Sequence, residues 1–300
     1  MPGSIRAAVA DPANTARTWL NRCQRGVAQA PPGVSGLWPR VRHGHSAPAR
    51  RRPPSRERAT QGWLAPTRAS HGRQGYPPAM CGRFVQLPVV DLGLPGLADL
   101  APGLAEIQPS FNLAPTQRAA VILDRCEGRQ VTRMAWGLLP FWAKAKGLQG
   151  SMINARIETV ATKPAFRTAF KKRRCVIPMA GYYEWSISPE DGKKDPWFIH
   201  ATGPLLAAGL WEDTSPLLPD GNLGTFTIIT GDSSGVSADI HDRMPVWLQA
   251  NQIDDLMAAS SDDAMAMLLA SEPPAMEAYR VSRAVNTPRN NAEGLLEPVA

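Results

Sequence analysis

Hydrophobic and polar positions divide the chain near residue 80. In residues 1–79 the apolar positions follow neither the period of a helix nor that of a strand. The stretch HSAPARRRPPSRERATQGW (45–63) is typical of this part, because it is rich in Arg, Pro and Ser. Such a segment cannot bury enough apolar surface to offset its chain entropy. We therefore expect residues 1–79 to be a disordered basic arm, a presequence, or upstream sequence included by a wrongly chosen start.

Beyond this boundary, apolar runs alternate with turn residues and predict strands with interspersed helices. A helix with a basic end is expected at 163–174, because Phe166 and Phe170 are four residues apart. Further helices are expected within 88–108 and 251–271. The expected strands are 81–87, 119–124, 131–140, 175–185, 196–201, 205–213, 224–233 and 279–286. The pattern predicts an α+β fold, with a mainly antiparallel curved sheet or barrel and flanking helices.

Charge changes how the first segment is interpreted. Residues 1–79 contain 13 Arg, no Lys and two acidic residues, whereas residues 80–300 contain 20 basic and 24 acidic residues. The overall charge of +7 therefore comes from the first segment and does not indicate that the folded body binds nucleic acid. An Arg-rich, acid-poor segment is also typical of transit peptides. Import into an organelle thus remains open beside the expected cytoplasmic, nucleoid-associated location.

Cysteine usage and hydropathy exclude several classes of protein. The cysteines form no CxxC pair, which fits a reducing compartment and argues against zinc, so no metal and no cofactor are expected. No apolar run approaches the roughly 18 residues that span a bilayer, and the first twenty residues lack the apolar core of a secretory signal. No membrane partner is expected. The four cysteines are Cys23, Cys81, Cys126 and Cys175.

Cys81 directly follows Met80, and this position has a chemical consequence. If Met80 is the start residue and is removed, Cys81 carries both a free amine, with a pKa near ~8, and a thiol, with a pKa near ~8.5. An aldehyde would condense with the amine to an imine, and the thiol would then close a thiazolidine ring. An abasic site in DNA is in equilibrium with such an aldehyde. The alternative is that Cys81 is a small buried hydrophobic residue.

Three further residues have side chains suited to this chemistry. Glu184 lies in an aromatic stretch where burial would raise its pKa toward the range of general acid–base catalysis, although it could instead pair with a structural Arg. His241 follows an expected loop and could transfer a proton, or it could be a surface or capping residue. Asn154 offers an uncharged donor and acceptor, or it could be a turn residue. Gly181, just before Glu184, would allow another segment to approach closely.

Five short motifs resemble those of one family. They are MCGRF (80–84), WGLLPFWAK (136–144), NARIET (154–159), GYYEW (181–185) and HDRMPV (241–246). Together they resemble the SRAP proteins, which process abasic sites in DNA, and the resemblance runs from Met80 to about residue 298.

The resemblance implies the SRAP fold for residues 80–300 and a covalent thiazolidine crosslink between Cys81 and abasic sites in single-stranded DNA. It further implies that Glu184 assists sugar opening and proton transfer, and that Asn154 hydrogen-bonds the amine or the new ring. The intermediate imine would also permit lyase activity. Arg83 and Arg156 would hold flanking phosphates, although each could instead form a salt bridge.

A DNA-binding surface on a net-negative body must be local. The basic run 163–174 would follow phosphates, although such runs are usually solvated helix faces. Aromatic side chains could stack on bases beside the lesion, but they are at least as often core residues. Two more residues match a family segment near the DNA groove. The DNA-binding candidates are thus Arg167, Lys171 and Lys172 in the basic run, Trp136 or Trp142 as a wedge, and Asn112 and Pro115 in the groove.

Two alternative functions remain open at this point. Cys81, His241 and Asn154 could form the nucleophile, base and orienting residue of a thiol peptidase that removes its own leader, and the family has been described as autoproteolytic. The chain could also be a non-enzymatic DNA-binding protein that uses residues 1–79 as a basic arm. The leading hypothesis remains a monomeric protein whose partner is single-stranded DNA with abasic sites.

Overall fold

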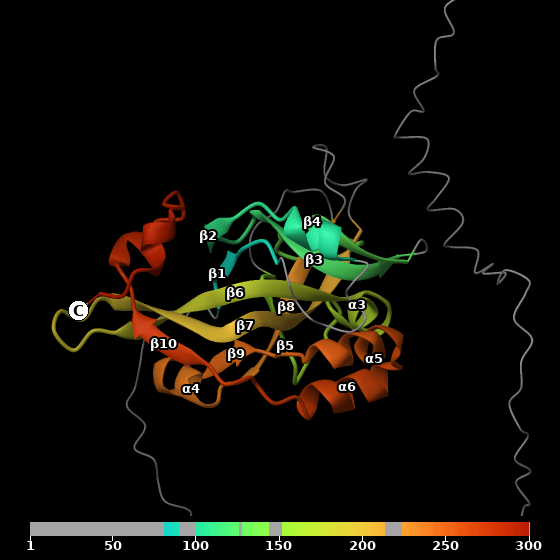
Figure 1. The fold of residues 1–300 in the computed structure, drawn as a ribbon. Helices are drawn as coiled ribbons and strands as arrows, with labels where there is room; N and C mark the ends of the chain where they lie inside the picture. The colour runs from blue at the N-terminus through green and yellow to red at the C-terminus, as the bar shows by residue number, and fades with distance from the viewer. Residues whose placement is uncertain (1–80, 90–99, 126–127, 144–151, 214–223, 300) are drawn as a thin grey trace, which may run out of the picture. The chain divides into compact units, whose positions relative to one another are not determined.

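The computed structural model describes residues 81–89, 100–125, 128–143, 152–213 and 224–299 (Figure 1). Two units divide the chain, Met1–Gly75 and Tyr76–Ala300, and all described residues lie in the second. The predictions for residues 1–79 and for Met80 therefore fall outside the described residues.

The described strands form one sheet in which most neighbours are antiparallel. The only parallel pairs among the described strands are those of β8 with β4 and of β8 with β5. The strands are β1 (Arg83–Gln86), β2 (Ser110–Leu113), β3 (Arg118–Arg125), β4 (Gly128–Trp136), β5 (Asn154–Arg156), β6 (Arg174–Ile187), β7 (Lys194–Glu212), β8 (Thr225–Asp232), β9 (Arg243–Pro245) and β10 (Glu277–Arg280). The order along the sheet is β10-β7-β8-β4-β3-β6-β1-β2, and β9 pairs with β8.

The central strands close on themselves. β6 pairs with β3 on one side and with β7 on the other, while β7, β8, β4 and β3 are consecutive neighbours. Five strands therefore form a ring, and β1 and β2 extend the sheet from β6. The prediction of an α+β fold with a mainly antiparallel, curved or barrel-like sheet is confirmed.

Alternating residues of the ring strands face two separate apolar clusters. In β3, Val121 and Leu123 belong to a cluster with Trp136 and Cys81. Ile122, between them, belongs to a second cluster that contains Phe170 of α3 and residues of α5 and α6. Because both faces of these strands are covered, their sequences are continuous apolar runs and do not alternate with polar residues.

Short helices cover the ends and the outer side of the sheet (Figure 1). The helical prediction for 251–271 is confirmed in the form of two helices, and the side chain of Ser260 caps the second by accepting from Asp263 N at 3.2 Å. The described helices are α2 (Ala101–Ala105), α3 (Arg167–Lys172), α4 (Val236–Ile240), α5 (Ile253–Ala258) and α6 (Ser261–Leu269).

Three other predicted elements differ from the structure. The helix expected at 163–174 comprises only α3, because Arg173 is already non-helical and Arg174 begins β6. The strands expected at 196–201 and 205–213 are parts of the single strand β7. The strand expected at 279–286 ends at Arg280, and the chain then forms the 3-10 turn η3 (Arg283–Asn286).

The C-terminal segment packs against β1 and β2 through polar contacts. This segment contains η3 and a second 3-10 turn, η4 (Glu293–Leu296). The buried side chain of Asn112 donates to the carbonyls of Val285, Thr287 and Asn290 at 3.1, 3.1 and 2.8 Å. In return, Asn291 Oδ1 accepts from the backbone of β2. The end of the chain thus stabilises the sheet edge that follows Cys81.

Candidate functional site

Strand pairing brings Cys81 next to Glu184. Cys81 lies two residues before β1, and β1 pairs with β6 so that Arg83 is opposite Tyr183. The backbone nitrogen of Cys81 donates to Glu184 Oε1 at 2.7 Å. The exposed fractions of the two residues are 0% and 1%, so this contact is shielded from water.

Burial changes the proton affinity of both side chains. It raises the pKa of Glu184 to about 8, and the charge of Asp242 adds to this, although the hydrogen bond from Cys81 opposes it. A carboxyl group with this pKa exists in both forms near neutrality and can give or take a proton. Burial and the charge of Glu184 also raise the pKa of the Cys81 thiol well above its ordinary value. The thiol is therefore protonated, and it is a weak nucleophile before any substrate is bound.

Asn154 contacts the same cysteine from another strand. It begins β5, which runs parallel to β8, and its Nδ2 donates to the carbonyl oxygen of Cys81 at 3.4 Å. Ala155 faces the core, so the exposed Arg156 shares a face of β5 with Asn154. Cys81 therefore contacts both Glu184 and Asn154, and all three residues were predicted for the site.

His241 follows α4, which is tied to β6 close to this centre. The Tyr182 hydroxyl on β6 lies 2.7 Å from Ser237 Oγ on α4, and both groups are buried. The His241 side chain is 7% exposed. Its Nδ1 accepts from the backbone nitrogen of Arg243 at 3.0 Å, and in this arrangement a neutral ring carries its proton on Nε2. Nε2 is buried and has no hydrogen-bond partner among the described residues.

Sequence reasoning missed Arg243, which anchors the strand after His241. Its guanidinium donates to Asp232 at 2.6 Å, to Glu158 at 3.0 Å and to the carbonyl of Thr230 at 2.7 Å. These contacts connect β9 with β8 and with the end of β5. Because the backbone nitrogen of Arg243 also contacts His241, the anchor positions the imidazole. A charged residue inside the HDRMPV motif was the only sign of this role in the sequence.

Two predicted DNA-binding residues are core residues. Trp136 is 0% exposed, lies 5.0 Å from Phe84 between ring centroids, and donates its Nε1 hydrogen to Ile153 O at 2.9 Å. Asn112 is 1% exposed and its amide is bonded to the C-terminal segment. Neither side chain can reach a base or a phosphate, so the predictions of a Trp136 wedge and an Asn112 groove contact were wrong.

Arg83 has protein partners as well. Its guanidinium donates to Asn112 Oδ1 at 3.0 Å and to Val285 O at 2.8 Å. Arg83 alternates along β1 with Phe84, whose side chain belongs to the cluster of Cys81. The guanidinium therefore stabilises the C-terminal segment, and its contact with phosphate stays a prediction.

The remaining DNA-binding candidates lie in two places. Trp142 is 56% exposed and its neighbour Phe141 is 60% exposed, in the connection that leads to β5, while Pro115 is half-buried after β2. Arg167, Lys171 and Lys172 are exposed on α3. Because α3 precedes Arg174 and Glu184 is ten residues further along β6, the basic helix lies roughly 30 Å from Cys81. These DNA contacts stay predictions.

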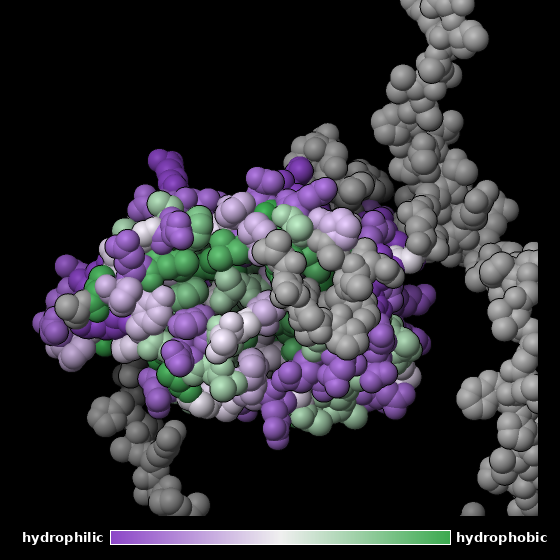
Figure 2. All heavy atoms as spheres, viewed as in Figure 1, coloured by the Kyte–Doolittle hydropathy of each residue, from purple (hydrophilic) through white to green (hydrophobic). Residues whose placement is uncertain are grey.

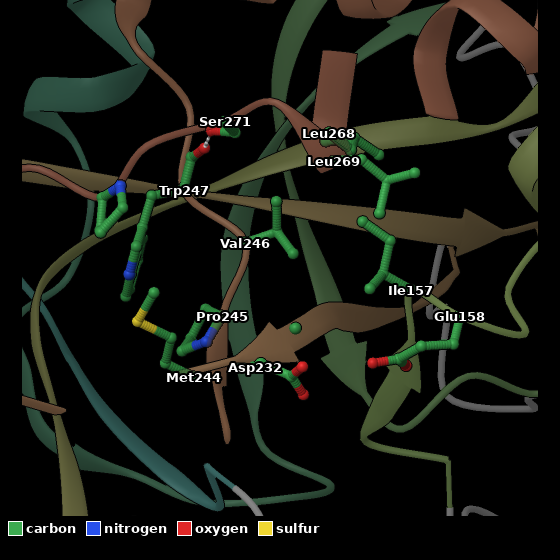
Figure 3. Close-up of a pocket in the computed structure, with 12 residues that line it drawn as sticks. Ile157, Glu158, Asp232, Met244, Pro245, Val246, Trp247, Leu268, Leu269 and Ser271 are labelled. Atoms are coloured by element: carbon green, nitrogen blue, oxygen red, sulfur yellow. Dashed lines mark hydrogen bonds between the residues drawn. The ribbon is translucent and has the colours of Figure 1, made fainter. Parts of the chain in front are cut away.

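Apolar residues also gather on one face of the molecule (Figure 2) and around a cavity. Polar residues cover the margins of the face in Figure 2, and apolar residues gather near its middle, where Figure 1 shows β1 and β6. A cavity of about 310 Å³ lies between β8, β9 and the end of α6, with Val246, Leu269 and Ile157 around it (Figure 3). None of the predicted catalytic residues lines this cavity.

The described residues contain neither a metal-binding group nor a membrane-spanning helix. Within the described ranges, no three His, Cys, Asp or Glu residues are grouped so that they could hold a metal ion. No helix in these ranges is long and apolar enough to cross a bilayer.

The fold and the site define an α+β protein with a buried cysteine–carboxylate centre beside a closed sheet. Residues 80–288 match the model of the SRAP family, described as SOS response associated peptidase. The chain therefore belongs to the SRAP family.

Individual relatives agree with this assignment. The chain is 37% identical over 226 residues to the abasic site processing protein YoaM of Bacillus subtilis (strain 168), which covers 73% of this chain and 98% of YoaM. It is 30% identical over 230 residues to the abasic site processing protein YedK of Escherichia coli (strain K12), which covers 73% of this chain and 100% of YedK. A solved structure of a protein from Bacteroides thetaiotaomicron has the same fold, with a TM-score of 0.54 at 22% identity, over 67% of this chain and 91% of that one.

Proposed function

We propose that this protein processes abasic sites in single-stranded DNA by forming a covalent crosslink through Cys81. The observation that carries the proposal is the 2.7 Å contact between the backbone nitrogen of Cys81 and the buried carboxyl of Glu184. This nitrogen would be the α-amine if the chain began at Cys81. A group that can accept and return protons thus lies at the atom that would attack the aldehyde. The names of YoaM and YedK support the choice of abasic DNA as substrate.

The proposal requires that Met80 is removed as the start residue. The match to the family model begins at Met80, and 73% of this chain matches the whole length of YedK. The region after Met80 thus corresponds to a complete protein in Escherichia coli.

The backbone of Cys81 also favours removal of Met80. Cys81 has a φ of 21°, at the edge of the left-handed region that residues with a Cβ rarely adopt. Such conformations cost of order 1–3 kcal/mol, and this cost disappears when no residue precedes Cys81.

The proton affinities favour a reaction in which nitrogen attacks first. The amine of Cys81 adds to C1′ of the opened sugar, and loss of water gives an imine. Glu184 takes the proton from nitrogen and returns one to the departing hydroxyl. The thiol then adds across the imine, so that sulfur bonds to carbon and the proton goes to nitrogen. The raised pKa of the Cys81 thiol supports this order, because a protonated thiol does not compete for the aldehyde at the start.

Three other residues have roles in the same proposal. Asn154 orients Cys81 through its carbonyl oxygen. The Nε2 of His241 contacts the oxygen of the sugar ring. Arg156 binds a flanking phosphate, and Trp142 stacks on a neighbouring base. The imine also permits β-elimination at the 3′ side, so we propose lyase activity as a companion that competes with ring closure.

Thiol peptidase activity is the second candidate, because the family description names a peptidase. The geometry favours it less. In the described residues the partner of Cys81 is the carboxyl of Glu184, through the backbone nitrogen, and burial disfavours the thiolate that a cysteine peptidase needs. Full-length protein that cleaves itself before Cys81, with Cys81→Ala left uncut, would support this function.

The test compares proteins that differ only at the nitrogen of Cys81. One begins at Cys81, verified by intact mass, and another has a single Ala before Cys81. Each is incubated with single-stranded DNA that contains one abasic site and is then analysed on a denaturing gel. We expect a covalent product from the first protein, and none from the Ala-extended protein or from Cys81→Ala. An equal yield of irreversible product from the Ala-extended protein would refute the thiazolidine mechanism.

A further inference from the structure

The imidazole of His241 has two neighbours of opposite character at one ring nitrogen. Nδ1 lies 3.0 Å from the backbone nitrogen of Arg243, which can only donate a hydrogen. It also lies 3.1 Å from Oδ1 of Asp242, which as a carboxylate can only accept one. Nδ1 therefore has a partner whether or not it carries a proton.

The two arrangements give opposite properties to Nε2, which is buried and unpartnered in the described part of the chain. When Nδ1 accepts from Arg243, the neutral ring carries its proton on Nε2, and Nε2 is a donor. When Nδ1 donates to Asp242, Nε2 of the neutral ring is an acceptor. Opening a sugar ring needs both properties, because one oxygen loses a proton and another gains one.

We propose that Asp242 is a positioning residue that lets His241 change from donor to acceptor at Nε2 during opening of the abasic sugar. This inference rests on the proposed function. In the acceptor state, Nε2 takes the proton of the C1′ hydroxyl, and Nδ1–H of the imidazolium donates to Asp242. Nε2 then returns the proton to the ring oxygen as the bond from that oxygen to C1′ breaks and the aldehyde forms. Asp242 itself gains no proton.

The surroundings make one partner rigid and the other adjustable. The backbone of Arg243 is held in place because its guanidinium contacts Glu158 and Asp232. The side chain of Asp242 is 83% exposed, so water competes with His241 for its carboxylate. An exposed pair of this kind contributes little to folding stability. The charged residues in contact with the imidazole are Asp242 and Arg243. From β6, Glu184 lies close enough to Asp242 for the charge of Asp242 to raise its pKa.

The experiment compares Asp242→Asn with Asp239→Asn. Asp239 is exposed on α4, three residues away, so both variants lose one negative charge at nearly the same place. Single-turnover crosslinking is measured with the protein that begins at Cys81, under saturating DNA. We expect Asp242→Asn to be about tenfold slower, Asp239→Asn to match the wild type, and Asp242→Glu to recover most of the rate. The same rate for Asp242→Asn and Asp239→Asn would overturn the proposal.

A second measurement does not depend on DNA. Full-length chain labelled with ¹⁵N-histidine is studied by NMR, where the ¹⁵N shifts distinguish protonated from bare ring nitrogens. We expect the Nδ1 signal of His241 to move toward the bare form in Asp242→Asn and to stay in place in Asp239→Asn. An unmoved signal in Asp242→Asn would overturn the switch even if crosslinking occurs. If the protein that begins at Cys81 forms no crosslink, although the Nδ1 signal moves in Asp242→Asn, the proposed function is refuted instead.

Discussion

At the scale of single residues, the raised pKa of Glu184 has a consequence for stability. Burial raises this pKa to about 8 in the folded chain, whereas an unfolded Glu titrates near ~4.3. The folded state therefore binds the proton more tightly. The stability that this adds is fully present below the unfolded pKa and is lost progressively as the pH rises toward 8.

We therefore expect the full-length protein to lose stability relative to Glu184→Gln between pH 5 and pH 8, by at most about 1.4 kcal/mol per pH unit. Gln keeps the acceptor for the nitrogen of Cys81 and has no proton to release. The measurement is urea unfolding of both proteins across this range, with the difference in free energy of unfolding plotted against pH. Parallel curves would show that Glu184 has an ordinary pKa in the folded chain.

The sequence predicted some site residues and not others, for physical reasons that differ between residues. Cys81, Glu184 and Asn154 lie in motifs whose chemistry is visible in the sequence, and the structure places them in contact. Trp136 and Trp142 are the same residue type six positions apart, and only tertiary packing makes one 0% and the other 56% exposed. The contact between Tyr182 and Ser237 could not be predicted, because it joins residues 55 positions apart that have no periodic relation.

At the scale of elements, β6 needs a glycine three residues before Glu184. A Cβ on Gly181 would lie 2.7 Å from the carbonyl oxygen of Ile199 and 2.4 Å from the ring of Phe198, both on β7. The predicted close approach at Gly181 is therefore confirmed. The backbone of Ile199 cannot move aside, because it belongs to the β6–β7 ladder.

We expect Gly181→Ala to lower the free energy of unfolding by about 1–3 kcal/mol, through the strain of overpacking. Gly203→Ala is the matched control. Gly203 lies on β7, the strand against which Gly181 packs, and a Cβ there meets nothing within 4 Å. The control should change stability by less than about 0.5 kcal/mol. Both values come from denaturant unfolding with a common slope. Equal stabilities of the two variants would contradict the close packing of β6 on β7 at Gly181.

Element boundaries were predictable where apolar runs are long and not where pairing defines the strand. The runs 119–124 and 175–185 correspond to β3 and β6. β5 and β9 have three residues each, too few for a period, and they are strands only because β8 lies beside them. The closed ring could not be predicted either, since it requires β6 to pair with β3 and β8 to pair with β4, and both pairs join strands that are distant in sequence.

At the scale of the whole molecule, the candidate active site and the basic helix lie at opposite ends of β6. Glu184 is ten residues from Arg174, so Cys81 and α3 are separated by roughly 30 Å. Phosphates on one strand of a duplex are about 3.4 Å apart along the axis, and an extended single strand spans roughly twice that per nucleotide, so between about five and nine nucleotides cover this distance. A phosphate contact at α3 would therefore reach DNA far from the lesion and would not belong to the reaction centre.

This separation predicts that the length of the DNA decides whether α3 matters. We expect Lys171→Gln with Lys172→Gln to weaken binding of a 25-nucleotide abasic strand, and to reduce the slope of log affinity against log salt by about 1.4 if both contacts are made. A strand with two nucleotides on each side of the lesion should bind the variant and the wild type equally, because even fully extended it cannot reach from Cys81 to α3. The short strand is thus the internal control for folding and for the reaction centre.

The measurement is fluorescence anisotropy across a range of salt concentrations, with Cys81→Ala as background so that no covalent product forms. Equal losses for both lengths would place the α3 lysines beside the lesion, and no loss for either would make α3 an ordinary solvated helix face.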